Sequence, residues 1–254
     1  MTGILLCGCA GKMGKVITAQ VKNSDDVRIV GGIDLFTDCG ADYPVFSSPS
    51  EVSDKIIGQT DVIVDFSNPS SFAGLIEFAV RTGKPAVIAT TGLNEAQLSL
   101  LRSASGKIPV FFSANMSLGV SLIAQLAQKA ASVLGDDFDV EIVEMHHNQK
   151  IDAPSGTALM LADAVKEALD TDVKYEYDRH SKREKRSKSE IGIHSIRGGT
   201  ITGEHEIIFA GHDEIIKISH SARSKELFAV GAINAARFLC GKPSGLYGMK
   251  ELIG

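Results

Sequence analysis

Up to Asn115, the chain alternates short runs of apolar residues with stretches in which apolar positions recur at helical spacing. In the stretch 12–22, Met13, Val16 and Ile17 would share one face of a helix, and the stretch 70–81 has the same spacing. An alternation of buried strands and amphipathic helices is typical of a doubly wound parallel sheet. The predicted strands are 4–7, 27–33, 61–66, 85–90 and 108–113.

The pattern changes after Asn115. A helical stretch at 120–134 leads into 139–147, where alternating apolar positions predict a strand that ends at His146 and His147. Further strand-like segments follow with little helix between them, which is typical of a mainly antiparallel sheet in an α+β domain. These segments are 190–196, 206–210 and 214–219.

The last helical stretch, 226–240, is expected to pack back on the first domain. We therefore predict two domains. The first is an α/β domain formed by 1–117 and completed by 227–254, and the second is an α+β domain formed by 118–226. In open α/β sheets, ligands bind at the carboxyl ends of the strands, so the first domain is a candidate ligand-binding domain.

Composition and charge narrow the possible partners. A chain of 254 residues with 44% hydrophobic residues can bury a large core. Its 31 acidic residues outnumber 26 lysines and arginines, for a net charge of -5, so no nucleic acid or anionic membrane is expected as a partner. The apolar run 4–7 is too short for a signal peptide or a membrane span, and we expect a cytoplasmic protein.

The cysteines and histidines give no sign of a disulfide framework or of a bound metal. Cys7, Cys9, Cys39 and Cys240 are too few and too irregularly spaced for either. Two adjacent histidines on a strand point to opposite sides, and no further ligands cluster near them at metal spacing. We therefore predict no metal site.

The stretch 178–190 is rich in Lys and Arg and poor in apolar residues. Such a run is usually a solvated, mobile loop, and we favour that interpretation. A basic flap that attracts an anionic substrate or cofactor is the alternative.

A glycine-rich turn after the first predicted strand is a candidate phosphate site. Gly8, Gly11 and Gly14 recur between a strand and a helix, where backbone N–H groups can contact a pyrophosphate. The spacing differs from the usual G-x-G-x-x-G, and an ordinary strand-to-helix turn is the alternative. Together with the strand and helix pattern, the turn predicts a Rossmann-like, dinucleotide-binding domain. The candidate cofactor contacts here are Gly8, Cys9, Ala10, Gly11, Lys12 and Met13.

Asp34 follows the second predicted strand and is a candidate for cofactor choice. A carboxylate at this point can accept hydrogen bonds from the ribose of an adenosine. It also repels a 2′-phosphate, and the next residue is Leu35 rather than a cation. We therefore predict NADH as the preferred cofactor, with NADPH possible.

The stretch EMHHNQKIDAPSGTA, 144–158, concentrates residues that could carry chemistry. His146 and His147 would point to opposite sides of a strand end, so one can transfer a proton while the other binds. Lys150 adds a second N–H donor or a cation for a carboxylate. A lone histidine is more often structural, but this combination in one loop favours a function.

The same stretch contains the start of a predicted helix. Ser155, Gly156 and Thr157 precede amphipathic sequence, and free N–H groups at a helix N-terminus can bind a carboxylate. The loop is therefore expected to hold an anion and to deliver a proton beside it.

Residues 141–158 resemble the signature E-I-x-E-x-H-x-x-x-K-x-D-x-P-S-G-T-A of the 4-hydroxy-tetrahydrodipicolinate reductase (dihydrodipicolinate reductase) family. Ala89 stands where Gly is common in that family, and Asn148-Gln149 replaces a more basic pair. The second departure affects only how much positive charge surrounds the substrate. The resemblance extends over the whole chain through 8–13, Asp65-Phe66, Thr90-Thr91-Gly92, 113–117 and 241–246.

The resemblance implies a cytoplasmic reductase of diaminopimelate and lysine biosynthesis. It would transfer a hydride from NAD(P)H to 4-hydroxy-tetrahydrodipicolinate, a small dicarboxylate, with loss of water. The second domain would bind the substrate and form a homotetramer through its sheet. His146 would be the proton donor or acceptor, and Lys150 a second donor. The substrate would contact His147, Ser155, Gly156, Thr157 and Thr91, and the cofactor would contact 8–13, Asp34, Ala89, Thr90, Thr91, Ser113, Ala114, Asn115 and Met116.

Two other functions are alternatives. A non-catalytic, dinucleotide-sensing binding protein would not need a histidine and a lysine beside an anion site. A two-domain dehydrogenase that acts on a semialdehyde would normally need a catalytic cysteine in mid-chain, and none lies between Cys39 and Cys240. The residues therefore favour the reductase.

Overall fold

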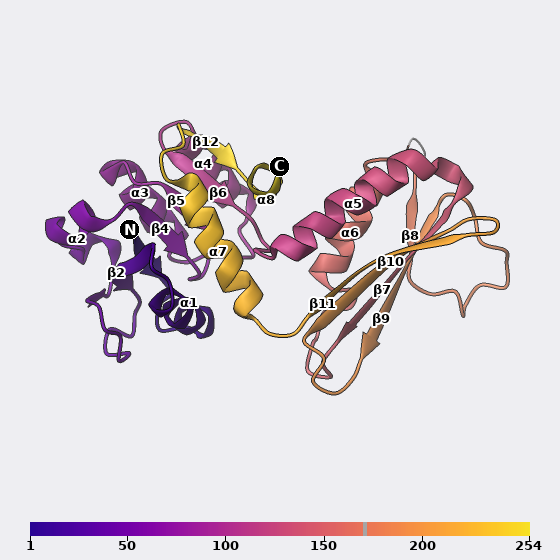
Figure 1. Ribbon diagram of the computed structural model, residues 1–254, viewed down its shortest axis with the longest axis horizontal. Helices are drawn as coiled ribbons and strands as arrows, with labels where there is room; N and C mark the ends of the chain where they lie inside the picture. The colour runs from indigo at the N-terminus through magenta and orange to yellow at the C-terminus, as the bar shows by residue number, and fades with distance from the viewer. Residues whose placement is uncertain (170–171) are drawn as a thin grey trace. The chain divides into compact units, whose positions relative to one another are not determined.

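The computed structural model describes residues 1–169 and 172–254. They divide into two compact units, each with its own sheet (Figure 1). Each unit also has its own hydrophobic core. Unit 1 comprises Met1–Leu118 and Lys225–Gly254, and unit 2 comprises Gly119–Ser224.

Unit 1 is built on a parallel sheet with the strand order β12-β6-β5-β4-β1-β2-β3. The chain winds outward from β1 in both directions, and the reversal beside β1 is where such sheets bind ligands. The predicted Rossmann-like, doubly wound fold is confirmed. The strands are β1 (Thr2–Cys7), β2 (Val27–Ile33), β3 (Val45–Phe46), β4 (Val62–Asp65), β5 (Ala86–Ile88), β6 (Pro109–Phe112) and β12 (Gly245–Tyr247).

Alternate residues of each strand face opposite helical layers. On β1, Ile4 and Leu6 pack in the layer with α1 and α7, whereas Leu5 and Cys7 pack in the layer with α2, α3 and α4. Because both faces are covered, the strand is a continuous apolar run. The helices are α1 (Lys12–Lys22), α2 (Asp54–Gln59), α3 (Phe72–Thr82), α4 (Glu95–Ser105), α7 (Glu226–Leu239) and α8 (Met249–Ile253), with a 3-10 turn η1 (Pro49–Glu51).

Helix α7 packs on the core of unit 1. Its small residues Ala229 and Ala232 are fully buried in the same cluster as Ile17 of α1. Gly231 makes the tightest approach, because a Cβ there would lie 1.6 Å from the Met116 carbonyl oxygen. The helix therefore holds in place a segment that contains predicted cofactor contacts.

Some predicted boundaries in unit 1 are wrong by a few residues. The helix predicted from residue 70 begins at Phe72, because the Asn68 side chain accepts a hydrogen bond from Ser70 N and holds a turn before it. Apolar spacing did not predict α4, although Asn94 and Gln97 form a reciprocal capping box at its start.

Unit 2 contains a mixed sheet with the strand order β11-β10-β7-β9-β8. Strand β10 pairs antiparallel with β7 and β11, whereas β9 pairs parallel with β7 and β8. The parallel pairing of β7 and β9 arises because the chain crosses over through a helix between them. The α+β class is confirmed. The strands are β7 (Asp139–His146), β8 (Lys174–Glu176), β9 (Glu190–Arg197), β10 (Gly203–Ala210) and β11 (Ile215–Ala222).

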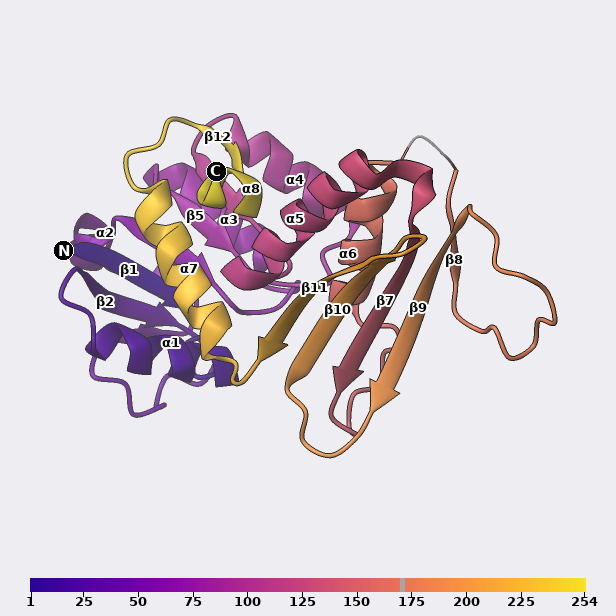
Figure 2. The ribbon, with the colours of Figure 1, turned by 45° about the vertical axis from the view of Figure 1, so that its right-hand side comes forward.

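Helices α5 (Leu118–Leu134) and α6 (Gly156–Lys166) cover one face of this sheet (Figure 2). On β7, Val140 and Ile142 face these helices, and Glu144 and His146 continue the same buried row. Within the described residues, one segment, 118–137, has the length and mean hydropathy, 1.2, of a membrane span. It contains α5 and the 3-10 turn η2 (Gly135–Asp137), and core helices often meet the same criterion.

The strands of unit 2 differ from prediction at the ends that lie near His146. Strand β7 ends at His146 rather than at His147. Strand β10 begins at Gly203 and β9 reaches Arg197, both beyond the predicted limits. These extensions bring more of the sheet into contact with His146.

One arginine anchors the basic stretch 178–190. Arg186 donates to Glu141 Oε1 (2.9 Å) and Asp139 Oδ1 (2.8 Å). It also donates to the carbonyl oxygens of Val140 (2.9 Å) and Glu190 (2.7 Å). Its charge is therefore satisfied within unit 2, while most of the other side chains in the stretch are exposed.

Candidate active site

Unit 1 forms a glycine-rich turn between β1 and α1. Gly8 has a φ of 77°, and a Cβ at Gly14 would lie 2.3 Å from the Gly8 carbonyl oxygen, so both positions need glycine. Three N–H groups of the turn are used within the protein: Gly8 N donates to Ile33 O (2.9 Å), Ala10 N to Asp34 Oδ2 (2.9 Å) and Gly11 N to Gly8 O (3.1 Å). The N-terminus of α1, at Lys12, is therefore the part of the turn that suits an anion.

A cavity of about 600 Å³ lies beside this turn. Asp34 lines it together with Leu35 and Phe36, whose side chains are 82% and 75% exposed. Asp34 Oδ1 also accepts from Phe36 N (3.1 Å), so backbone donors orient the carboxylate from both sides. The described residues that line the cavity include no Lys or Arg, so no cation offsets the charge of Asp34 there.

A second cavity, of about 260 Å³, shares Phe66 and Ser67 with the first. The buried Asp65 carboxylate holds its wall, because it accepts from Thr90 Oγ1 (2.7 Å) and from Ser67 Oγ (2.5 Å). Burial raises the pKa of Asp65 above its usual value. Asp65 therefore fixes the two loops that follow β4 and β5.

The structure brings most of the predicted cofactor residues to these cavities. The side chain of Cys9 is an exception, because it is buried in the core and leaves only backbone for a ligand. Ser113 Oγ donates to the carbonyl oxygen of Asn115 (2.7 Å) and shapes the turn before Met116. Gly8, Gly11 and Asp34 line the first cavity, and Met13, Ala89, Thr90, Thr91, Ala114 and Met116 line the second.

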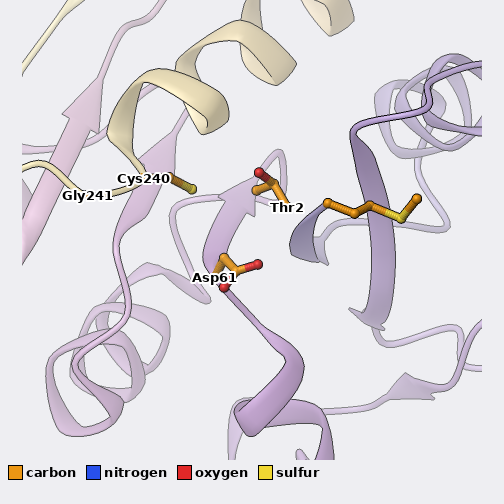
Figure 3. A pocket seen from close by; sticks show the side chains of 5 residues that line it. Thr2, Asp61, Cys240 and Gly241 are labelled. Atoms are coloured by element: carbon orange, nitrogen blue, oxygen red, sulfur yellow. The ribbon is translucent and has the colours of Figure 1, made fainter.

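A further cavity, of about 310 Å³, lies at the amino ends of β1 and β4 (Figure 3). Asp61 at its wall accepts a hydrogen bond from Gly3 N (2.7 Å). The glycine-rich turn follows the carboxyl end of β1, so this cavity lies at the opposite edge of the sheet. It is not part of the candidate site.

In unit 2, Glu144 and His146 form a buried pair at the end of β7. Glu144 is 0% exposed, and its Oε2 lies 2.6 Å from His146 Nδ1. Arg197, at the end of β9, donates to both carboxylate oxygens at 2.8 and 2.7 Å. Burial by itself raises the pKa of Glu144, but hydrogen bonds from Arg197 and His146 lower it to about 2. Glu144 is therefore an anion at neutral pH.

His205 connects this pair to helix α6. It lies opposite Glu144 on β10, with its ring centroid 5.2 Å from that of His146 and its Nε2 3.1 Å from Ser155 Oγ. Burial, and then the proximity of His146, lowers the pKa of His205 to about 4. His205 Nδ1 is buried and has no hydrogen-bond partner among the described residues. The neutral ring therefore places its proton on Nε2, which donates to Ser155.

Ser155 caps helix α6 and leaves one donor for a ligand. Its Oγ accepts from Ala158 N (3.1 Å) and from His205 Nε2, which fills both acceptor positions of the hydroxyl. The O–H proton is then the remaining hydrogen-bonding group. With the helix N-terminus at Gly156, it provides a site suited to a carboxylate.

The loop between β7 and α6 places a cation in the same region. Lys150 N donates to His147 O (3.1 Å), and Lys150 Nζ lies 2.8 Å from Asp152 Oδ1. That contact lowers the pKa of Asp152. His147 Nδ1 is buried without a hydrogen-bond partner among the described residues. A carboxylate ligand would therefore compete with Asp152 for Lys150.

Comparisons with known proteins identify the family. Residues 2–116 match the family model described as "Dihydrodipicolinate reductase, N-terminus", and residues 119–253 match "Dihydrodipicolinate reductase, C-terminus". The chain belongs to the dihydrodipicolinate reductase family. The resemblance drawn from the signature at 141–158 is thus confirmed.

Two relatives named 4-hydroxy-tetrahydrodipicolinate reductase match over nearly the whole chain. The protein of Caldanaerobacter subterraneus subsp. tengcongensis is 48% identical over 253 residues, which cover 100% of this chain and 98% of the relative. That of Clostridium tetani is 47% identical over 249 residues, 98% of this chain and 96% of the relative. The structure of dipicolinate-bound dihydrodipicolinate reductase from Paenisporosarcina sp. TG-14 matches with a TM-score of 0.81 and 25% identity, covering 99% of both chains.

In this member of the dihydrodipicolinate reductase family, sequence reasoning missed three residues around His146 and Ser155: Glu144, Arg197 and His205. Glu144 belongs to the signature and had a usable signal, because the alternation of β7 places it in the buried row with Ile142. No local pattern pointed to Arg197 or His205, because each lies more than fifty residues from Glu144 along the chain. Among the described residues, no group of three or more His, Cys, Asp or Glu side chains could hold a metal ion.

Proposed function

We propose that this protein is a 4-hydroxy-tetrahydrodipicolinate reductase, which reduces that cyclic imine dicarboxylate to tetrahydrodipicolinate with loss of water. Unit 1 holds the nicotinamide dinucleotide, and unit 2 holds the substrate. The observation that carries the proposal is the Glu144–His146 pair beside the capped N-terminus of α6. This pair supports the proposal, because the reduction of a dicarboxylate ring requires a proton carrier next to a carboxylate site. Membership of the dihydrodipicolinate reductase family supports the same substrate class.

The dinucleotide fits unit 1, where a helix N-terminus, the Asp34 carboxylate and two neighbouring cavities follow the strands. When bound, its reduced nicotinamide supplies the hydride. The reaction also needs a proton, and His146 donates it from Nε2, the ring nitrogen that Glu144 does not occupy. General acid catalysis of this kind contributes roughly 10² to 10⁴ in rate.

The substrate carboxylates bind at the start of α6. The Ser155 hydroxyl and the helix N-terminus, at Gly156 and Thr157, meet one carboxylate. Lys150 exchanges Asp152 for substrate and supplies a cation, and His147 adds a ring nitrogen. The acidic protein therefore binds its anionic substrate through a local site.

For the cofactor, we propose a preference for NADH over NADPH. The support is the fixed Asp34 carboxylate at the wall of a cavity whose described lining has no Lys or Arg to bind a 2′-phosphate. The measurement is kcat/KM for each cofactor with the unchanged protein and with Asp34→Asn. We expect the unchanged protein to favour NADH and the variant to narrow the difference. A higher kcat/KM for NADPH in the unchanged protein would contradict the charge argument.

We also propose a homotetramer that forms through the sheet of unit 2. Helices α5 and α6 cover one face of the sheet. On the other face, the outward-facing alternate residues of β11 are exposed. Ile196 and Ile215 are 46% and 63% exposed. Light scattering coupled to size exclusion measures the mass directly, and a monomer at assay concentration would refute this assembly.

The test of the function is NADH oxidation with substrate made in place from aspartate semialdehyde, pyruvate and the synthase that joins them. His146→Gln is expected to lower kcat about 10²-fold or more while leaving NADH affinity nearly unchanged. His194→Gln is the matched control, because His194 also pairs with a glutamate, Glu141, in the same sheet. If the protein binds NADH but does not oxidise it, the dinucleotide-sensing alternative is favoured and the reductase proposal is wrong.

A further inference from the structure

We propose that Glu144, held by Arg197, is a positioning residue that fixes the tautomer of His146 and ties its ring to the N-terminus of α6. His146 Nε2 is then the only ring nitrogen left to carry the reacting proton. The inference rests on the proposed reductase function, because it concerns the proton carrier of that reaction.

The Glu144 carboxylate is saturated with hydrogen-bond donors. Oε2 faces His146 Nδ1 (2.6 Å) and Arg197 Nη1 (2.8 Å), while Oε1 accepts from Ser155 N (3.1 Å) and Arg197 Nη2 (2.7 Å). An ionised carboxylate only accepts hydrogen bonds and offers about four positions for them. All four positions face a donor, so His146 Nδ1 must carry its hydrogen.

Arg197 fixes this carboxylate in place. Arg197 lies opposite His146 in the parallel pairing of β7 and β9. Its Nη2 also donates to the carbonyl oxygen of Asp152 (2.5 Å), so the guanidinium is held from the loop as well as from the strand. Arg197 balances the buried charge of Glu144, and a buried carboxylate without such a partner would be costly.

His146 Nε2 lies beside the start of strand β10. Gly203, at the start of β10, has no side chain, and a Cβ there would lie 3.1 Å from Nε2. Glycine therefore adds no side-chain atom beside this nitrogen, while Glu144 occupies the other nitrogen.

Glu144 also connects His146 to the proposed carboxylate site. The same Glu144 oxygen that accepts from Arg197 Nη2 also accepts from Ser155 N, one residue before helix α6 begins. The proton carrier and the carboxylate site therefore share one rigid acceptor. A shift of Glu144 would move both groups together.

The direct test is the tautomer of His146, measured by long-range ¹H–¹⁵N NMR on protein labelled in its histidine rings. His146→Gln assigns the signals by their loss. We expect the neutral ring of the unchanged protein to carry its hydrogen on Nδ1. A neutral ring with the hydrogen on Nε2 would overturn the proposal, and this measurement depends on no variant of Glu144.

Glu144→Gln provides the second measurement. The new amide carries both a donor and an acceptor, so it can no longer receive all four hydrogen bonds, and its N–H₂ group can donate to His146 Nδ1. We expect part of the ring population to move to the Nε2–H tautomer and kcat to fall about 10- to 100-fold. Unchanged tautomer and kcat would overturn the proposal.

Glu141→Gln is the matched control. Glu141 lies on the same strand and also accepts from an arginine, Arg186 Nε (2.9 Å), and a histidine, His194 Nε2 (2.8 Å). We expect unchanged His146 signals and kcat within about twofold of the unchanged protein. An equal loss of kcat in this control would overturn the proposal by showing a general effect of the strand. Absence of turnover in the unchanged protein would refute the reductase function instead, and the tautomer measurement would stand.

Discussion

Acidification is expected to destabilise unit 2 through His205. This ring is 5% exposed, and its neutral form donates to Ser155 while packing against His146. Burial is the main cause that lowers its pKa from 6.5 to about 4. In the unfolded chain the ring takes up a proton below pH 6.5, whereas in the folded protein it stays neutral down to about pH 4. The contribution of His205 to stability is therefore fully present above the unfolded pKa, and it is lost as the pH falls from the unfolded pKa to the folded pKa.

The magnitude follows from the two pKa values. At about 1.4 kcal/mol for each tenfold change in proton affinity, the fall from 6.5 to about 4 corresponds to about 3 kcal/mol over the whole window. Between about pH 7.5 and about pH 5, the free energy of unfolding is expected to drop by about 2 kcal/mol from this residue. Most carboxylates stay ionised over this range, so their contribution is small.

The assay is hydrogen exchange of the β10 amides in urea, which reports on unit 2 by itself. We compare the unchanged protein with His205→Gln, whose amide N–H₂ can still donate to Ser155. On acidification, the free energy of unfolding of the variant is expected to fall by about 2 kcal/mol less than that of the unchanged protein. His212→Gln is the control, because the His212 side chain is 97% exposed. Equal losses in the unchanged protein and His205→Gln would refute the reasoning.

Two further predictions concern the surroundings of His146 and the basic stretch. Gly203→Ala places a methyl group 3.1 Å from His146 Nε2 and is expected to lower kcat about fivefold to tenfold in a steady-state assay. Gly198→Ala is the control, because nothing lies within 4 Å of its new Cβ, and we expect it to leave kcat unchanged. Arg186→Gln removes ion pairs to Glu141 and Asp139 and is expected to lower the free energy of unfolding of unit 2 by about 2 kcal/mol in urea. The exposed Arg183→Gln is its control, and equal stability of the two variants would contradict the anchoring role.

The predictable part of the fold depends on signals that act over short distances. The buried run at β1, the glycine-rich turn and the helical spacing of α1 are each complete within about a dozen residues. The Ser155 cap of α6 is similarly local, because its side chain accepts from an N–H three residues later. The missed elements β3, β8 and β12 have two or three residues each, too few for a period to appear.

For the site, the sequence predicted His146 as the proton carrier, and it showed the start of helix α6 and the glycine-rich turn. Each of these features combines residues that are close in the chain, so a short sequence motif is enough to indicate its chemistry. How His146 is held depends on contacts between strands that are distant in the chain. Arg197 reaches Glu144, and His205 reaches Ser155, because of the register of β7 with β9 and β10. Register depends on packing over the whole sheet, and no local pattern of residues specifies which distant side chains it brings together.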